Sequence, residues 1–414
     1  MKKSFLFLVA LLATLAISLS GCGDELERRG YKYDESNDWY VKDSEEKDGE
    51  VVEGTFVNLT KSPSDLSKQF IVTPEINRVV FIGNSSVDYI NFNVVIDGRT
   101  SDVYIELRNF KFTAPEGEDG INAEDVFSSY KVFIISSGTS AVYGGKGEGG
   151  EKGTSYDYKG SSSASKDGGK GAEGGIGCSA ISGNSVYIVS ESSSIFTLVG
   201  GDGGTGGNGG DGEGSKGGGM GTVGKGAGNG GLGGAGGQGG SALNIGSKLE
   251  IENKGKISLI GGVGGHGGNG GHGGNGGNPA FASPDDGGDG GNGGLGGAGG
   301  LGVELQNSAE VKVTNKTVIL KGGDGGLGGN GGDGGDGHKW VMDYVSQGAN
   351  AGNAGNGGNG GDGGISTNSD ERSLFTCESC KGGKGGKAGN PGAAPKGSGL
   401  AGNDGSTGSA PIES

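Results

Sequence analysis

Few side chains in this chain have the types and the spacing that chemistry requires. Histidine occurs three times in 414 residues. His266 and His272 stand in a run where two residues of every three are glycine. An extended helix with three residues per turn and a rise of about 3.1 Å per residue would place them about 19 Å apart. That distance is too long for two ligands of one metal ion, so no metal site is predicted on this segment.

Aspartate and asparagine recur at the third position of many glycine triplets. Their oxygen atoms suit Ca²⁺, but consecutive carboxylates of one segment are too far apart to share an ion. A Ca²⁺ site would need acids from adjacent segments, so solvation is the favoured role and no cofactor is expected. Together with threonine, these residues also form the surface best suited to face a ligand: Asp202, Thr205, Asn208, Asn269, Asn275, Asp324, Asn330 and Asp333.

A second group of charged residues resembles the requirements of a polysaccharide lyase, which needs carboxylates and an arginine or lysine on one face. The group consists of Asp102, Glu106, Arg108 and Lys111. The first three alternate onto one face of a predicted strand at 102–112. That face can equally be the solvated one. The chain has no serine-nucleophile or phosphate-loop motif in the required context, so we predict no catalytic residue and no enzyme.

The cysteines divide into Cys22, a lone Cys178, and the pair Cys377 and Cys380. One Cys-x-x-Cys pair with no second pair and no nearby histidine is a poor zinc site. Outside the cytoplasm, a local disulfide between Cys377 and Cys380 is favoured. The net charge of −16 makes nucleic acid an unfavourable partner.

The glycine triplets are the most informative pattern in the chain. Residues 261–278 repeat two glycines and one other residue at a period of three, and the whole chain has only 8 prolines. In a left-handed three-residue helix, equivalent residues share one ridge, so two ridges would be bare backbone. Bare ridges let neighbouring helices approach closely. The strict period favours an ordered bundle over the alternative, a flexible glycine-rich linker.

The triplets belong to repeats of about 60 residues, long enough for a solenoid unit. The repeats begin at Ala123, Ala180, Ala242 and Gly302. Each contains two short apolar strands, a triplet arm, a variable tip and a returning triplet arm. Strands that cannot bury an apolar face alone must stack on the next repeat. We therefore expect an all-β fold: a parallel β-helix-like solenoid with projecting polyglycine II hairpin arms, which must fan or interleave.

The N-terminus reads as a targeting segment. Lys2 and Lys3 precede an apolar run that ends in Leu19-Ser20-Gly21-Cys22. This motif resembles the lipobox of bacterial lipoproteins, and the resemblance implies cleavage before Cys22 and lipidation of that residue. Several acyl chains give stable membrane anchoring. Gly23 in place of aspartate implies, by the same resemblance, the outer membrane of the bacterial cell envelope, with the protein periplasmic or surface-exposed.

Two further resemblances concern the body of the chain. The triplet arms resemble the polyglycine II bundles of glycine-rich antifreeze proteins and of PE_PGRS-like segments. The strand units, especially 103–135, resemble pectate-lyase-type right-handed β-helices, with no signature residues to carry over. Fold similarity alone does not give function.

These patterns predict five regions. They are a signal peptide (1–21), an acidic tether (22–50), an N-terminal β region that caps the solenoid (51–120), the glycine-rich repeats (121–390) and a disordered tail (391–414). Aromatic residues of the tether, such as Trp39, could instead dock on the body. The expected function is a lipid-anchored, non-enzymatic scaffold for adhesion, in contact with carbohydrate or another cell-surface polymer. The alternatives are a β-helix polysaccharide lyase and an ice-binding protein.

Overall fold

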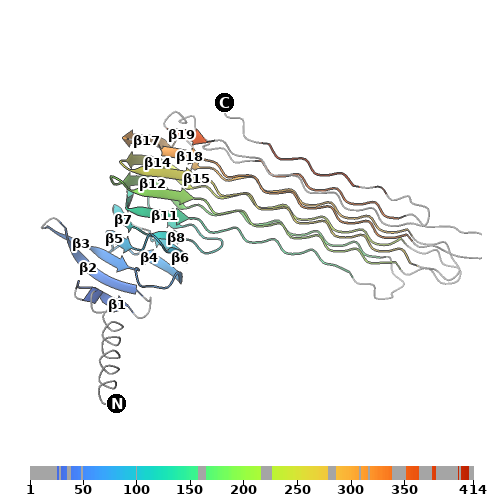
Figure 1. The fold of residues 1–414 in the computed structure, drawn as a ribbon, viewed down its shortest axis with the longest axis horizontal. Helices are drawn as coiled ribbons and strands as arrows, with labels where there is room; N and C mark the ends of the chain where they lie inside the picture. Colours follow the sequence, from blue (N-terminus) through green and yellow to red (C-terminus); the bar gives the residue numbers. More distant parts are fainter. Residues whose placement is uncertain are drawn as a thin grey trace, which may run out of the picture.

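The structure is a computed structural model, and every element of its described part between residues 32 and 378 is a β-strand (Figure 1). It describes residues 26–27, 29–34, 39–47, 50–98, 100–156, 165–215, 226–277, 286–306, 309–315, 318–337, 351–362, 375–378, 400 and 402–409. The strands are β1 (Lys32–Asp34), β2 (Trp39–Lys47), β3 (Glu50–Asn58), β4 (Asp65–Val72), β5 (Arg78–Ile82), β6 (Asp88–Ile96), β7 (Val103–Arg108), β8 (Lys111–Thr113), β9 (Ile121–Ala123), β10 (Val132–Ser137), β11 (Thr139–Tyr143), β12 (Ile181–Ser190), β13 (Ile195–Val199), β14 (Leu243–Asn253), β15 (Lys256–Ile260), β16 (Val303–Leu305), β17 (Glu310–Asn315), β18 (Val318–Lys321) and β19 (Phe375–Glu378).

Parallel pairing arranges most strands in three rows. Row one contains β3, β5, β7, β10, β12, β14 and β17. Row two contains β4, β6, β9 and β16 with the first residues of β12 and β14. Row three begins at the start of β6 and continues through β8, β11, β13, β15, β18 and β19. The expectation of an all-β fold with mostly parallel strands is confirmed.

Most of the buried apolar side chains of the three rows form one hydrophobic cluster, and a second, smaller cluster contains Leu26, Tyr31, Phe56 and Val80. In strands such as β10, alternate residues are buried, and the pairing register places equivalent residues of successive repeats side by side. In row one the inward column is Ile105, Ile134, Ile188, Ile251 and Val313. A buried isoleucine contributes about 1.5–3 kcal/mol. Because each repeat supplies only one layer of this column, stacking on its neighbours is what buries it.

The N-terminal segment packs on the body. β1 and β3 pair antiparallel with β2, and β3 continues into row one through β5. Trp39 at the start of β2 is 3% exposed, and its ring lies 6.2 Å from that of Phe92 in the core. The alternative of docked aromatics therefore describes residues 39–47 better than a solvated tether does. The residues of the proposed signal peptide lie outside the described ranges.

The glycine segments project together from one side of the strand rows (Figure 1). We call segments 144–156, 200–215, 261–277 and 322–337 the outgoing arms, and segments 165–178, 226–241, 286–301 and 351–362 the returning arms. Segment 402–409 pairs with returning arm 351–362, through donation from Gly357 to Asn403 at 2.8 Å. Within the described residues, no helix is long and apolar enough to cross a membrane.

Hydrogen bonds join the arms in two interleaved layers, one formed by the outgoing arms and the other by the returning arms. The first glycine of a triplet donates to the same layer in the next repeat, as Gly203 does to the Val263 carbonyl at 2.8 Å. The second glycine donates to the other layer, as Gly204 does to the Gly175 carbonyl at 2.8 Å. An extended helix with three residues per turn has no internal hydrogen bonds, so these contacts between arms satisfy its backbone. The arms thus interleave rather than fan.

Both glycines of an inner triplet are required by this packing. A Cβ atom on Gly203 would lie within 3.0 Å of the Gly237 carbonyl, and one on Gly204 equally close to the Glu148 carbonyl. At the two ends of the stack of arms, side chains replace some of these glycines. In the first outgoing arm, exposed Glu148, Glu151 and Thr154 occupy the second position of the triplet. In segment 402–409, exposed Asp404 and Thr407 occupy the first position. At each end, the ridge that carries them has no neighbouring arm among the described residues.

A candidate contact face on the glycine arms

The predicted ligand-facing residues all lie on the outgoing arms, at the third position of their triplets. A period of three places equivalent residues on one ridge, and parallel packing aligns the ridges of successive arms into one face. Asp202, Thr205 and Asn208 are exposed on one arm, Asn269 and Asn275 on the next. On outgoing arm 322–337, Asp324 and Asn330 are exposed and Asp333 is partly exposed. We call this surface the outgoing-arm face.

Side chains of this face form ladders from arm to arm. Asn208 Oδ1 accepts a hydrogen bond from the Asn269 backbone N–H at 2.9 Å, and Asn269 Oδ1 accepts one from Asn330 at 2.9 Å. Gly209 completes the contact by donating to the Asn269 carbonyl at 2.7 Å. The N–H groups of the first and second glycines donate to backbone carbonyls of other arms, and the N–H of the third residue donates to a side chain instead. Sequence reasoning missed this role, although the recurrence of acceptor side chains at this position was the signal for it.

The two histidines of the face take the same structural part. His266 Nδ1 accepts a hydrogen bond from the Leu327 backbone at 3.0 Å, and His272 Nδ1 accepts one from Asp333 at 3.1 Å. In the neutral imidazole this nitrogen can be an acceptor, so it replaces an asparagine oxygen. Within the part of the chain that the structure describes, no group of histidine, cysteine or acidic residues could hold a metal ion.

The ladders leave part of each side chain for contact with solvent or a ligand. One asparagine has an amide NH₂ beyond its bonded oxygen, and one carboxylate has a second oxygen. These groups repeat about every 9 Å along an arm, which is the rise of three residues. Between them lie exposed apolar side chains, Val263 and Leu327. The face is thus a grid of hydrogen-bonding groups with apolar points.

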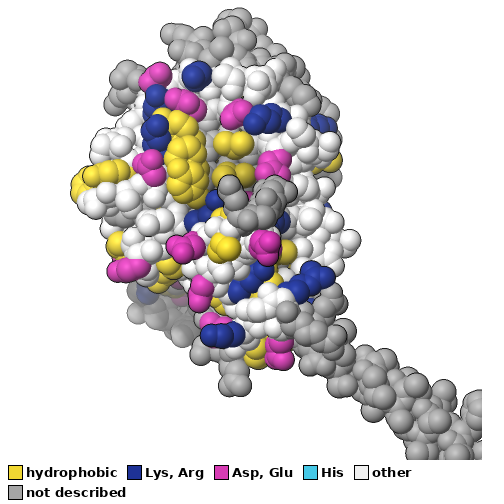
Figure 2. Space-filling model, turned by 90° about the vertical axis from the view of Figure 1, so that its left-hand side faces the viewer, with side chains coloured by type: hydrophobic (Ala, Val, Ile, Leu, Met, Phe, Trp, Pro, Cys, Tyr) yellow, Lys and Arg dark blue, Asp and Glu magenta, His cyan; other side chains and the backbone are white. Residues whose placement is uncertain are grey.

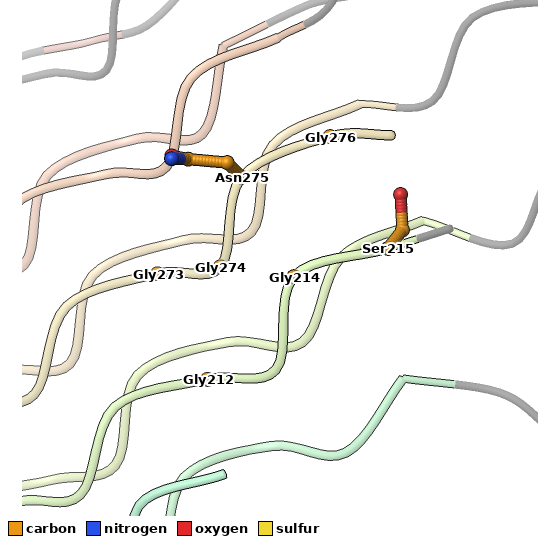
Figure 3. A pocket seen from close by; sticks show the side chains of 7 residues that line it. All are labelled: Gly212, Gly214, Ser215, Gly273, Gly274, Asn275 and Gly276. Atoms are coloured by element: carbon orange, nitrogen blue, oxygen red, sulfur yellow. The ribbon is translucent and has the colours of Figure 1, made fainter. Parts of the chain in front are cut away.

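A hollow of about 430 Å³ lies at the far end of the outgoing arms, between segments 200–215 and 261–277 (Figure 3). Its lining is mostly glycine, with Ser215 and Asn275. Ser215 Oγ accepts a hydrogen bond from Gly277 at 2.6 Å, and Asn275 Oδ1 accepts one from Asp336 at 2.9 Å. Both side chains already serve the contacts between arms, so this hollow offers no convergent set of ligand groups.

The charged group considered for a lyase is brought together only in part. Glu106 is 3% exposed and lies between two guanidinium groups. Its Oε1 accepts from Arg108 Nε at 2.6 Å, and its Oε2 from Arg78 at 2.8 Å. Arg108 also donates to Glu45 of β2 at 2.5 Å. Asp102 instead accepts from the Lys131 backbone, and Lys111 pairs with Asp88.

Electrostatics in this group favour a structural role. Burial raises the pKa of Glu106, but the hydrogen bonds and charge of Arg108, with those of Arg78, outweigh it and hold the pKa below its ordinary value. Burial lowers the pKa of Arg108, and hydrogen bonds to Glu106 and Glu45 outweigh this and raise it. A carboxylate held ionised by two cations is a weak proton donor or acceptor. Through Glu45, the group ties β2 to β7 of row one.

The cysteines supply no reactive site in the described residues. Burial, with the nearby charges of Asp119 and Glu118, raises the pKa of the Cys178 thiol to about 11. Cys178 is therefore a protonated, weakly reactive thiol at neutral pH. The side chains of Cys22, Cys377 and Cys380 lie outside what the structure describes, so lipidation and the disulfide remain predictions.

No family model and no curated protein matches the sequence. One solved structure shows partial similarity, a nine polyproline type II helical bundle antifreeze protein from the springtail Granisotoma rainieri. It is 25% identical to the aligned part, which covers 41% of this chain and 95% of that chain, with a TM-score of 0.12. A TM-score this low carries no inference about the fold or the function of the present chain.

Proposed function

We propose that the protein is a lipid-anchored extracytoplasmic scaffold, without enzymatic activity, that presents the outgoing-arm face to a repetitive polymer such as a cell-surface polysaccharide. In this proposal the strand rows form a parallel β-helix, and the arms form a polyglycine II bundle projecting from it. The observation that carries the proposal is the regular grid of amide, hydroxyl and carboxylate groups on one face. Hydroxyl-rich polymers with a regular repeat can bond to such a grid at many points, and the combined contacts raise avidity.

A pull-down with insoluble polysaccharides tests this function. We expect the mature chain to sediment with at least one regular polysaccharide. Replacing Thr205, Asn208 and Asn269 by alanine should reduce the bound fraction several-fold, because contacts of a multivalent surface act together. The matched control carries alanine at Asn353, Asn356 and Asn359 of the returning arm, which lose similar ladder contacts outside the outgoing-arm face. Equal binding by the two variants would contradict the role of the face. Thermal hysteresis without polymer binding would favour the ice-binding alternative.

Anchoring is tested separately by Cys22→Ser. If Cys22 carries the lipid, the variant should keep its signal peptide and lose its acyl chains. Because the retained signal peptide keeps its own apolar run, partitioning into detergent does not separate the two forms, and the mass of the chain is the first readout: the variant should be longer than the native protein by the uncleaved signal peptide. Metabolic labelling with a palmitate analogue supplies the second readout. A variant that is labelled and cleaved like the native protein would contradict lipid attachment at Cys22.

A further inference from the structure

The outer side of row one carries an aromatic column that the proposed function does not use. Tyr104, Phe133 and Tyr187 are aligned by the registers of β7, β10 and β12. The ring centroids of Tyr104 and Phe133 are 4.6 Å apart and those of Phe133 and Tyr187 are 5.1 Å apart. Figure 2 shows a column of hydrophobic side chains on this side of the molecule, with charged side chains beside it and beyond its upper end.

The column ends where the next strands carry shorter or more polar side chains. In the same register, Tyr187 is followed by Glu250 of β14 and then by Lys312 of β17. Two residues further along the same face, Val189 is followed by Glu252 of β14 and Thr314 of β17. A recess of about 320 Å³ lies at this step, with Phe133 and Tyr187 on one side and these polar residues on the other. Ligand sites of proteins begin at about this volume.

The charges around the recess nearly cancel: three carboxylates stand beside four lysines, namely Glu250, Glu252 and Glu310 with Lys131, Lys248, Lys254 and Lys312. Glu250 is paired with Lys248 at 3.0 Å, and Glu252 with Lys254 at 2.9 Å. Lys131 lies over the Tyr187 ring, with its Nζ 4.9 Å from the centroid. Because acids and bases alternate at contact distance, an ionic ligand gains little net Coulomb attraction here. A ligand that is neutral overall, yet able to accept and donate hydrogen bonds, fits both the aromatic side and the polar side of the recess.

We propose that this recess, the aromatic groove, binds a neutral oligosaccharide. A pyranose ring has a face of C–H groups that packs on an aromatic ring, and hydroxyl groups at its edge. Phe133 and Tyr187 supply the apolar side, and carboxylates that accept and a lysine that donates supply the polar side. Successive strands are about 4.8 Å apart, so the groove crosses several strands and takes a linear chain of sugars. This site is on the strand body and does not rest on the function proposed for the arms.

Isothermal titration of the full mature chain in detergent with soluble linear gluco- and manno-oligosaccharides tests the groove. Neutral chains should bind, and polygalacturonate, the anionic comparison, should bind at least several-fold more weakly. Phe133→Ala and Tyr187→Ala should each weaken binding about tenfold or more, since buried aromatic anchors carry much of the energy of an interface. Tyr33→Ala is the control, because Tyr33 is an exposed aromatic residue of β1 away from the groove.

A second measurement covers the case in which Phe133→Ala or Tyr187→Ala fails to fold. Glu252→Ala and Lys312→Ala change side chains at the rim and should weaken binding several-fold in a folded chain. In proton NMR, the C–H signals of a sugar stacked on a ring should move upfield in the native protein. Absence of binding by all neutral chains, binding unchanged in the rim variants, or preference for polygalacturonate would each overturn the proposal. The triple alanine variant of the outgoing-arm face should leave this binding unchanged, so the two functions fail separately.

Discussion

Replacing Gly265, Gly268 and Gly271 together by alanine is expected to unfold the arm bundle and to leave the strand rows folded. Each new Cβ atom would lie within 3.0 Å of a backbone carbonyl of the preceding outgoing arm, those of Gly204, Gly207 and Gly210. Backbone cannot move aside as the end of a flexible side chain can. Overpacking of this kind costs about 1–3 kcal/mol per site. Limited proteolysis should therefore cut the arms of the variant at protease concentrations that leave the native arms intact.

Two controls separate steric clash from a general effect of substitution. Glu148→Ala and Glu151→Ala occupy the same triplet position in the first outgoing arm, where native side chains already stand exposed. Asn269→Ser keeps a hydroxyl acceptor at the third position, as Ser155 does for Asp211 at 3.0 Å. Both controls should resist proteolysis. A loosely tethered glycine segment predicts the reverse order, because alanine restricts an unfolded chain. Equal resistance of the triple variant and the controls would exclude a packed bundle.

Glu106→Ala is expected to destabilise the body by about 3–5 kcal/mol, the usual effect of removing one partner of a buried ion pair. The change leaves the guanidinium groups of Arg78 and Arg108 without the carboxylate that both contact. Urea unfolding followed by tryptophan fluorescence is a suitable measurement, because Trp39 is a buried core residue of β2, the strand that Arg108 contacts through Glu45. Glu250→Ala removes a more exposed paired carboxylate and should cost no more than about 1 kcal/mol.

The ion group of Glu106, Glu45 and their arginine partners also predicts how the free energy of unfolding changes in acid. The pKa values of Glu106 and Glu45 are both lowered in the folded state, in each case because arginine contacts outweigh burial. A lowered carboxyl pKa contributes stability above the pKa of the unfolded chain, about 4.3, and this stability is lost as the pH falls through the folded pKa. The difference in unfolding free energy between the native chain and Glu106→Ala should therefore shrink below about pH 4. A constant difference down to pH 2 would contradict the assignment.

The sequence predicted the repeating parts of this fold well, because their physical signals are local. Alternation at 103–107 marks a half-buried strand, and the same column continues through Ile134, Ile188 and Ile251. The strict triplet period predicted bare ridges that pack closely. What the period could not decide was the direction of the contacts. Interleaving of outgoing and returning arms depends on which carbonyl each glycine reaches, as Gly204 reaches Gly175, and that partner is distant in sequence.

The candidate sites were predicted less fully, for two physical reasons. The third-position residues were correctly grouped by their period, but their ladder role requires the neighbouring arm to be in place, as Asn208 requires Asn269. Glu106 and Arg108 were grouped by alternation, whereas Arg78 and Glu45 come from other strands and complete the ion group. The aromatic column shows the same limit. Tyr104, Phe133 and Tyr187 stand far apart in the chain, and only the pairing register brings them together.

Amide hydrogen exchange within the arms tests the packed bundle most directly. In the inner arm 261–277, glycine N–H groups donate to backbone carbonyls, as Gly268 does to Gly234 at 2.8 Å, and the Asn269 N–H donates to Asn208. We predict slow exchange at all three triplet positions of this arm, with protection that rises together, because the arms open as a cooperative unit. Exchange at the rate of a free glycine-rich chain would contradict the bundle and would leave the strand rows as the only ordered part of the molecule.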